Sequence, residues 1–194
     1  ILIADGHHRF KTSTCYKKEI ENCSCCTQTS SAPVSSAYKY VLTYICSMVD
    51  PGLLILPTHR VLKTNPDIQT RINKHFVLSC WNGKKAPGLV ICQDNEFKTM
   101  TLKPAYKKYA DLPQVTILEK FLLHDVKPED IVYTKDISEA VKLAAQTYNG
   151  ITFLLEAPSM KSVYDTSKSN HVMPRKSTYF YPKIPAGITI YKLD

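Results

Sequence analysis

A predicted hairpin between residues 87 and 103 is the feature that most restricts how this chain can fold. An apolar run, PGLVICQ, is followed by the pair Asp94-Asn95 and then by the alternating run EFKTMTLK. Two strand-like segments joined by such a turn are typical of an antiparallel hairpin. Because a sheet must bury at least one face against other elements, the hairpin predicts a mixed or antiparallel sheet with helices packed on it.

Strand-like and helix-like patterns alternate along the rest of the chain. Runs rich in β-branched and aromatic residues predict strands over residues 38–49, 53–62 with a break at Pro57, 151–158 and 187–193. Apolar residues at helical spacing and capping signals predict helices over residues 6–21, 66–75, 112–125, 138–149 and 159–168. Asp5, Asn65 and Ser138 are the expected N-caps of three of these helices. The mixture predicts the α/β (mixed α+β) class.

The 194 residues are enough for a single domain over residues 1–194. The chain has no initiator Met and begins in a strand-like run, so we expect it to be the C-terminal half of a longer protein. Residues 22–37 are small and polar, which predicts a flexible loop. The seven cysteines are expected to be reduced, with Cys46, Cys80 and Cys92 acting as small buried hydrophobic residues.

The balance of charge favours anionic partners. Lys and Arg number 25 against 17 Asp and Glu, a formal net charge of +8, which suits phosphorylated metabolites, nucleotides, nucleic acids or membrane surfaces. The basic residues do not concentrate on a predicted DNA-binding helix, so a nucleic acid is disfavoured. No apolar run approaches the roughly 20 residues that span a bilayer, and no signal peptide is visible. We therefore expect a cytoplasmic protein with a small phosphorylated or nucleotide ligand.

The motif ADGHHRF at residues 4–10 joins a strand-like run to a predicted helix. The first N–H groups of a helix lack intrahelical partners and lie at the positive end of the helix dipole. Gly6 permits a tight turn, and His7, His8 and Arg9 add donors around the same point, which is how a helix start binds phosphate. The alternative is that Asp5 only caps the helix and the histidines pack against neighbours.

A second His-Arg pair, His59 and Arg60, ends the motif LPTHR at residues 56–60. Because Pro57 interrupts regular strand pairing, the pair is expected to project from the rim of a sheet. A partly buried histidine beside a surface arginine is an equally good interpretation of the pair alone.

A third basic motif, MPRKSTYFYPK, covers residues 173–183. Its candidate phosphate-binding residues are Lys176, Ser177, Thr178 and Lys183. The alternative is a basic edge strand whose aromatic residues alternate into the core.

These motifs, together with LLEAP at residues 154–158 and the closing GITIYKL, resemble the C-terminal half of the bacterial family known as domain of unknown function 1015. DGHHR is also similar to a motif of the ParB/sulfiredoxin-like fold, whose members bind nucleotides there and in some cases phosphorylate free serine. The resemblance therefore implies that fold around the motif and a link to serine metabolism. After DGHHR the family usually reads Tyr-Glu-Thr, whereas this chain reads Phe10-Lys11-Thr12, which implies a catalytically impaired copy if that glutamate acts in the reaction.

Two functions follow as hypotheses. The first is a small-metabolite kinase that uses ATP or ADP with Mg²⁺, because phosphoryl transfer mainly requires positioning and neutralisation of charge. In it, Gly6, His7, Arg9, Arg60, Lys176, Ser177, Thr178 and Lys183 bind phosphate; His8 or His59 takes the hydroxyl proton; and Asp5 contacts the metal. The second is a non-catalytic module that senses a nucleotide or phosphometabolite with the same residues.

Overall fold

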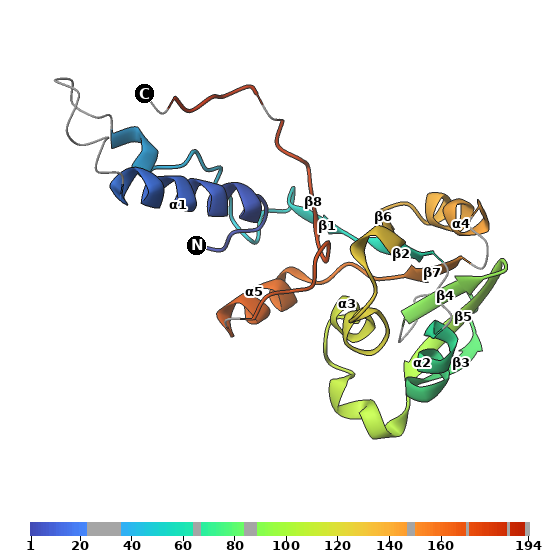
Figure 1. Ribbon diagram of the computed structural model, residues 1–194. Helices are drawn as coiled ribbons and strands as arrows, with labels where there is room; N and C mark the ends of the chain where they lie inside the picture. The colour runs from blue at the N-terminus through green and yellow to red at the C-terminus, as the bar shows by residue number, and fades with distance from the viewer. Residues whose placement is uncertain are drawn as a thin grey trace. The chain divides into compact units, whose positions relative to one another are not determined.

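The computed structural model describes residues 1–22, 36–63, 67–83, 89–146, 150–169, 171–185 and 187–192. The chain divides into two compact units (Figure 1). The small unit comprises Ile1–Leu53 with Pro182–Asp194, and the large unit comprises Leu54–Tyr181.

The large unit is built on a six-stranded antiparallel sheet with the strand order β3-β5-β4-β7-β2-β6. The strands are β2 (His59–Leu62), β3 (Phe76–Cys80), β4 (Leu89–Gln93), β5 (Glu96–Leu102), β6 (Ile131–Thr134) and β7 (Ile151–Leu154). The predicted hairpin is confirmed as β4 and β5, with Asp94 and Asn95 both at positive φ in the turn. The mixed α+β class with an antiparallel sheet is confirmed.

Helices cover both faces of this sheet (Figure 1). On one face, α2 (Ile68–His75), α3 (Gln114–Leu118) and the π-helical turn η3 (Glu119–Leu123) bury their apolar residues against the sheet around Phe153. On the other face, α4 (Ile137–Gln146) packs Ala140 and Ala144 against Val61 and Leu154. The helices predicted over 66–75, 112–125 and 138–149 are confirmed within the described residues, although Asn65 and Pro66 lie outside them.

Shorter elements complete the large unit. They are β1 (Leu54–Leu56), β8 (Tyr179–Tyr181), α5 (Met160–Lys168) and the 3-10 helices η2 (Pro104–Tyr109) and η4 (Pro128–Asp130). Strands β1 and β8 form a separate antiparallel pair, so the break at Pro57 between β1 and β2 is confirmed. In β8, Phe180 is buried and Tyr181 is exposed, which fits the strand alternative for the third basic motif.

The small unit holds the helix α1 (His7–Asn22), as predicted, and the 3-10 helix η1 (Ser36–Lys39). The strands predicted over 38–49 and 187–193 are wrong: no strand is assigned to the described residues of these segments. Their large apolar side chains are exposed, among them Tyr40, Leu42, Ile45, Ile188 and Ile190. An alternating apolar pattern forms a strand only where a neighbouring strand accepts its hydrogen bonds.

Two local predictions are wrong. The N-cap of α4 is Asp136, whose Oδ1 accepts from the Glu139 N–H at 2.8 Å, and not Ser138. Of the cysteines expected to be buried, Cys92 is buried, while Cys46 and Cys80 are exposed. No helix in the described parts of the chain combines the length and apolar character needed to span a membrane. Residues 23–35 of the predicted loop lie outside the described residues.

Candidate functional site

The DGHHR motif forms the start of α1 in the small unit. The first helical hydrogen bond runs from the Phe10 N–H to the Gly6 carbonyl at 3.0 Å, so the N–H groups of His7, His8 and Arg9 precede the helical ladder. These three residues are all exposed. The start of α1 therefore presents backbone donors and basic side chains to the same surroundings, which is an arrangement that binds anions.

Glycine at position 6 allows the arginine of the motif to fold back over the helix start. Gly6 has a φ of 82°, in the left-handed region that residues with a Cβ rarely adopt. A Cβ atom there would lie 3.1 Å from Nη2 of Arg9. The guanidinium thus lies against the turn that leads into α1, close to the first N–H groups.

Asp5 links the helix start to the far end of the chain. One carboxylate oxygen accepts from the Gly6 N–H at 2.8 Å, and the other pairs with the Lys183 ammonium group at 2.8 Å. The Lys183 hydrogen bond holds the pKa of Asp5 below its usual value, although partial burial opposes this. Asp5 therefore fixes the turn before the helix and does not cap a helical N–H, which corrects the predicted cap.

His59 and Arg60 are consecutive in β2, so their side chains point to opposite faces of the sheet. His59 lies on the α4 face with Val61, whereas Arg60 lies on the α3 face with Leu62. The expectation that the pair projects from the rim of a sheet is wrong, because β2 lies between β7 and β6 and both side chains are buried.

The His59 ring is buried, with an exposed fraction of 2%. Its Nδ1 accepts from the Leu155 N–H at 3.2 Å, which places the proton of the neutral ring on Nε2. Nε2 is buried without a hydrogen-bond partner in the described structure. Burial lowers the pKa of His59, and Arg60 adds to this effect, while Asp136 opposes it. His59 is therefore a neutral donor.

The burial of His59 predicts a loss of stability in acid. Because its folded pKa lies below the unfolded value, the unfolded state binds more protons as the pH falls through and below about 6.5. The free energy of unfolding is thus expected to decrease between about pH 7 and pH 5, and His59→Asn should flatten that slope. Urea titrations at a series of pH values measure it. Burial also lowers the pKa of His75, so His75 contributes to the pH dependence of stability that remains in His59→Asn. An unchanged slope in this variant would contradict the prediction.

Arg60 is the largest fully buried side chain of the chain's described residues, with 2% of its surface exposed. Its Nη1 donates to the Thr58 carbonyl at 2.7 Å, and its Nη2 donates to the carbonyls of Arg175 and Lys176, each at 3.3 Å. The guanidinium also lies over the Tyr133 ring, 5.5 Å from its centre. Burial lowers the pKa of Arg60 to about 10, still far above neutral, so the group is a buried cation.

The third basic motif forms a turn, residues 174–178, directly before β8. Lys176 has a φ of 55°, and the buried Ser177 hydroxyl donates to the Pro174 carbonyl. The side chains of Arg175 and Lys176 are exposed. Among the predicted residues, the structure thus brings Arg60 together with Lys176, while Asp5, Gly6, Arg9 and Lys183 meet in the small unit.

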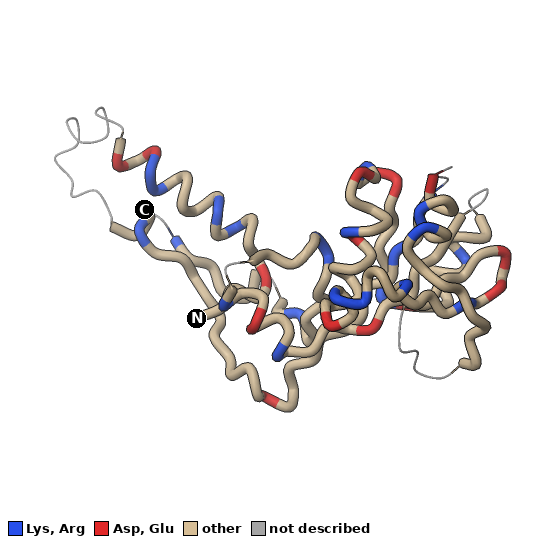
Figure 2. Tube along the Cα trace, turned by 90° about the horizontal axis from the view of Figure 1, so that it is seen from below, with Lys and Arg blue, Asp and Glu red and all other residues tan. Residues whose placement is uncertain are grey.

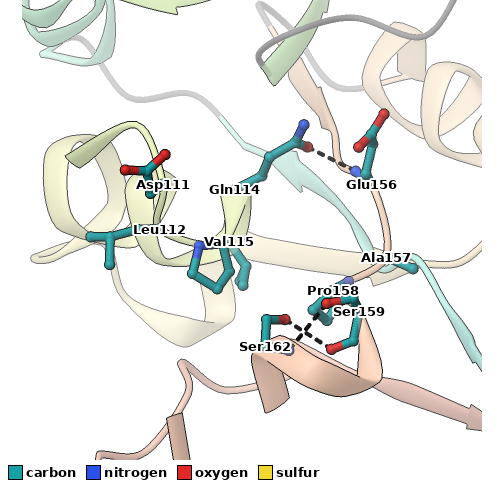
Figure 3. Close-up of a pocket in the computed structure, with 10 residues that line it drawn as sticks. Asp111, Leu112, Gln114, Val115, Glu156, Ala157, Pro158, Ser159 and Ser162 are labelled. Atoms are coloured by element: carbon teal, nitrogen blue, oxygen red, sulfur yellow. Dashed lines mark hydrogen bonds between the residues drawn. The ribbon is translucent and has the colours of Figure 1, made fainter. Parts of the chain in front are cut away.

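A cavity of about 310 Å³ lies elsewhere in the large unit, between the starts of α3 and α5 (Figure 3). Gln114 accepts from the Glu156 N–H at 2.8 Å across one side, and Ser159 and Ser162 hydrogen-bond to each other on the other. Its charged lining residues, Asp111 and Glu156, are acidic, so the cavity does not suit a phosphate group. None of these lining residues was a predicted site residue, although Glu156 lies in the LLEAP motif at residues 154–158.

The distribution of charged and metal-ligating residues limits which ligands the described residues could bind. Lys and Arg are spread along the described chain, with Asp and Glu among them, and do not gather over one element (Figure 2). No group of three or more His, Cys, Asp or Glu residues in the described ranges could hold a metal ion. Of the residues that sequence reasoning missed, Tyr133 and Glu119 contribute to the electrostatics of Arg60. Tyr133 lies in β6 and Glu119 directly follows α3, and no sequence motif marks either residue.

Comparison with known proteins gives one family and several solved structures of similar fold. A family model described as a protein of unknown function, DUF1015, matches residues 1–121. No curated protein matches the chain. A conserved hypothetical protein from Pyrococcus furiosus is 15% identical with a TM-score of 0.55, over 95% of this chain and 72% of that one. A free serine kinase variant in complex with ADP is 13% identical with a TM-score of 0.52, over 92% of this chain and 66% of that one.

Proposed function

Since the chain belongs to the DUF1015 family of proteins of unknown function, we propose a function from its own site: it binds a nucleotide by its phosphates and transfers a phosphoryl group to a small hydroxy metabolite. The observation that carries this proposal is the start of α1. There, free helical N–H groups, the Gly6 turn and the folded-back Arg9 guanidinium lie together. Such a helix start is suited to a phosphate group.

The similar fold of a free serine kinase supports the nucleotide part of this proposal. That protein is described in complex with ADP, and we propose ATP or ADP as the nucleotide here. Serine metabolism is the proposed context, and the cytoplasm is the proposed location. The ParB/sulfiredoxin-like fold around DGHHR stays a prediction.

The residues take the following proposed roles. Gly6, His7 and Arg9 bind the phosphates in the small unit, and Lys183 holds Asp5 in place. In the large unit, the turn with Lys176, Ser177 and Thr178 binds a phosphate group, and Arg60 supports that turn. His8 is the proposed acceptor of the hydroxyl proton, because the buried His59 ring already uses Nδ1 as an acceptor and holds its proton on Nε2.

Magnesium fits this site only in part. Asp5 is a single carboxylate, already bonded to Gly6 and Lys183, and the described residues offer no cluster that binds a metal ion by itself. Mg²⁺ usually keeps several waters and takes further ligands from substrate phosphates. The proposed ion would therefore be held mainly by the nucleotide, where it neutralises phosphate charge.

Nucleotide binding is tested by thermal shift with Arg9→Ala. A ligand at a hundred times its dissociation constant adds about 2.7 kcal/mol to the free energy of unfolding. We expect ATP or ADP with Mg²⁺ to raise the melting temperature of the wild type, and Arg9→Ala to abolish the rise. The matched control is Lys18→Ala, which removes one exposed positive charge from α1 but lies away from its start. A rise that persists in Arg9→Ala would contradict the site, and no rise with any nucleotide would contradict the function.

A non-catalytic sensor is the second candidate function. Lys11 favours the sensor function. The family usually has glutamate at this position, and with lysine there the first turns of α1 carry no acidic side chain. A sensor would bind nucleotide without ever forming product. ADP release from ATP in the presence of hydroxy amino acids and hydroxy acids distinguishes the two functions.

A further inference from the structure

The cavity between the starts of α3 and α5 is lined by a segment whose backbone is held by two other elements. This segment directly follows β7. Its Leu155 N–H donates to Nδ1 of His59, in β2, at 3.2 Å. Its Glu156 N–H donates to Oε1 of Gln114, in α3, at 2.8 Å (Figure 3). The backbone that carries the Glu156 carboxylate is therefore fixed before any ligand binds, which lowers the entropic cost of binding.

Ser159 and Ser162 supply an oriented acceptor on another side of the cavity. Ser159 is the N-cap of α5, and its Oγ accepts from the Ser162 N–H at 3.1 Å. The Ser162 hydroxyl donates its proton to the Ser159 carbonyl at 2.8 Å. Because a hydroxyl has a single proton to donate, Ser162 acts toward a ligand in the cavity as a hydrogen-bond acceptor.

The charged side chains that line the cavity, Asp111 and Glu156, are both acidic, although the whole chain has a formal net charge of +8. Two carboxylates and an acceptor hydroxyl repel an anion and favour a cation that donates hydrogen bonds. An ammonium group has three N–H donors and no acceptor, and its hydrogen bonds to carboxylates are charge-assisted. No third His, Cys, Asp or Glu joins them within the described ranges to make a group that could hold a metal ion. An organic cation therefore fits the lining better than a metal does.

The size of the cavity limits the rest of the ligand. Its volume of about 310 Å³ is at the lower end of the range for ligand pockets, about 300–1,000 Å³. Leu112, Val115 and Pro158 supply apolar lining, which suits a short carbon chain.

We propose that this cavity binds a small molecule that carries a primary ammonium group on a short carbon chain. Asp111, Glu156 and Ser162 accept hydrogen bonds from the ammonium group, and the apolar lining contacts the carbon chain. The proposal goes beyond the proposed function, because the start of α1 belongs to the small unit and the cavity belongs to the large unit.

Propylamine is the probe that tests this site. The full ¹⁵N-labelled chain is titrated at pH 7, where an alkylamine is protonated as lysine is. The amide signals of Glu156 and Ser162 are expected to shift in a saturable manner. Sodium propionate and 1-propanol, which replace the ammonium group by a carboxylate and by a hydroxyl, are expected to leave both signals in place at the same concentrations. Saturable shifts with propionate, or none with propylamine, would overturn the proposal.

Glu156→Gln removes one of the two carboxylates and keeps the size of the side chain. We expect the Kd for propylamine to rise about threefold to fivefold, the range for loss of an exposed ion pair. Glu129→Gln is the matched control, because Glu129 is exposed in η4 and does not line the cavity. An equal rise in both variants would assign the binding to net charge alone and overturn the site.

Ser162→Ala removes the acceptor hydroxyl but keeps the backbone N–H that Ser159 caps. The Kd for propylamine is expected to rise by about threefold or more, because a hydrogen bond from a charged donor is lost. Ser167→Ala, at an exposed position of the same helix, is expected to leave the Kd unchanged. Equal Kd values for the two variants would contradict the role of Ser162.

Magnesium chloride distinguishes an organic cation from a metal ion. We expect Mg²⁺ at the ionic strength of the propylamine titration to leave the Glu156 and Ser162 amides in place. If Mg²⁺ shifts these amides in a saturable manner and displaces propylamine, the cavity holds a metal ion and the proposal is overturned.

Discussion

Replacing Arg60 by alanine is expected to lower the free energy of unfolding of the large unit by about 3 kcal/mol or more, because several carbonyl groups lose one charged, buried donor. The change leaves the carbonyls of Thr58, Arg175 and Lys176 without their donor. Each buried carbonyl that loses its donor costs about 1–3 kcal/mol, and the void beneath Tyr133 adds to the loss. Chemical denaturation monitored by circular dichroism measures the effect.

The matched control for Arg60→Ala is Arg175→Ala. It removes an arginine from the same turn, but its side chain is exposed, and exposed substitutions usually change stability by less than about 0.5 kcal/mol. A loss below about 1 kcal/mol in Arg60→Ala would show that the guanidinium does not hold the turn. The comparison thus separates loss of the buried contacts from loss of positive charge near residues 174–178.

Local patterns predicted the elements whose signals lie within one segment. The β4–β5 hairpin follows from the Asp94-Asn95 turn between two apolar runs, and the break between β1 and β2 follows from Pro57. The start of α1 follows from the turn at Gly6, although Asp5 does not cap the helix as predicted. In each case the physical cause lies within a few residues of its effect, so the sequence alone is sufficient.

Elements that depend on distant partners were mispredicted or missed. The segment 38–49 has a strand composition, yet its described residues form no strand. Conversely, β3 and β6 are edge strands that were missed, because β3 has a mostly exposed pattern and β6 is only four residues long. Strand formation is decided by pairing across the sheet, and composition does not encode which segments become neighbours.

The candidate site shows the same difference between local features and features that depend on distant residues. The start of α1 at the DGHHR motif is a local feature and was predicted, but the ion pair between Asp5 and Lys183 joins residues 178 positions apart. Likewise, the motif LPTHR suggested that His59 and Arg60 project from the rim of a sheet. In β2, however, strand geometry sends His59 and Arg60 to opposite faces, so similar motifs have different roles on a helix start and in a strand.

The kinase proposal requires a proton acceptor, and the structure favours His8 over His59 for that role. His59 is buried, and its Nδ1 already accepts from the Leu155 N–H. His8 is exposed in the first turn of α1, beside the proposed phosphate-binding residues. His8→Ala is therefore expected to lower kcat by about a hundredfold or more, the usual contribution of general acid–base catalysis, with a much smaller effect on the affinity for nucleotide.

Steady-state ADP release from ATP, with the hydroxy metabolite that supports turnover, measures the loss in His8→Ala. His59→Asn is the control. Asparagine can still accept from the Leu155 N–H, and turnover is expected to persist because the buried His59 ring is proposed not to take the proton. If His59→Asn abolishes turnover while His8→Ala retains it, the roles are reversed and the base lies in the large unit.

If the wild type binds nucleotide yet releases no ADP with any acceptor, the helix start serves the sensor function. The free N–H groups of α1 and the Arg9 guanidinium would then explain nucleotide binding. Lys11, in place of the family's usual glutamate, would explain the lack of phosphoryl transfer.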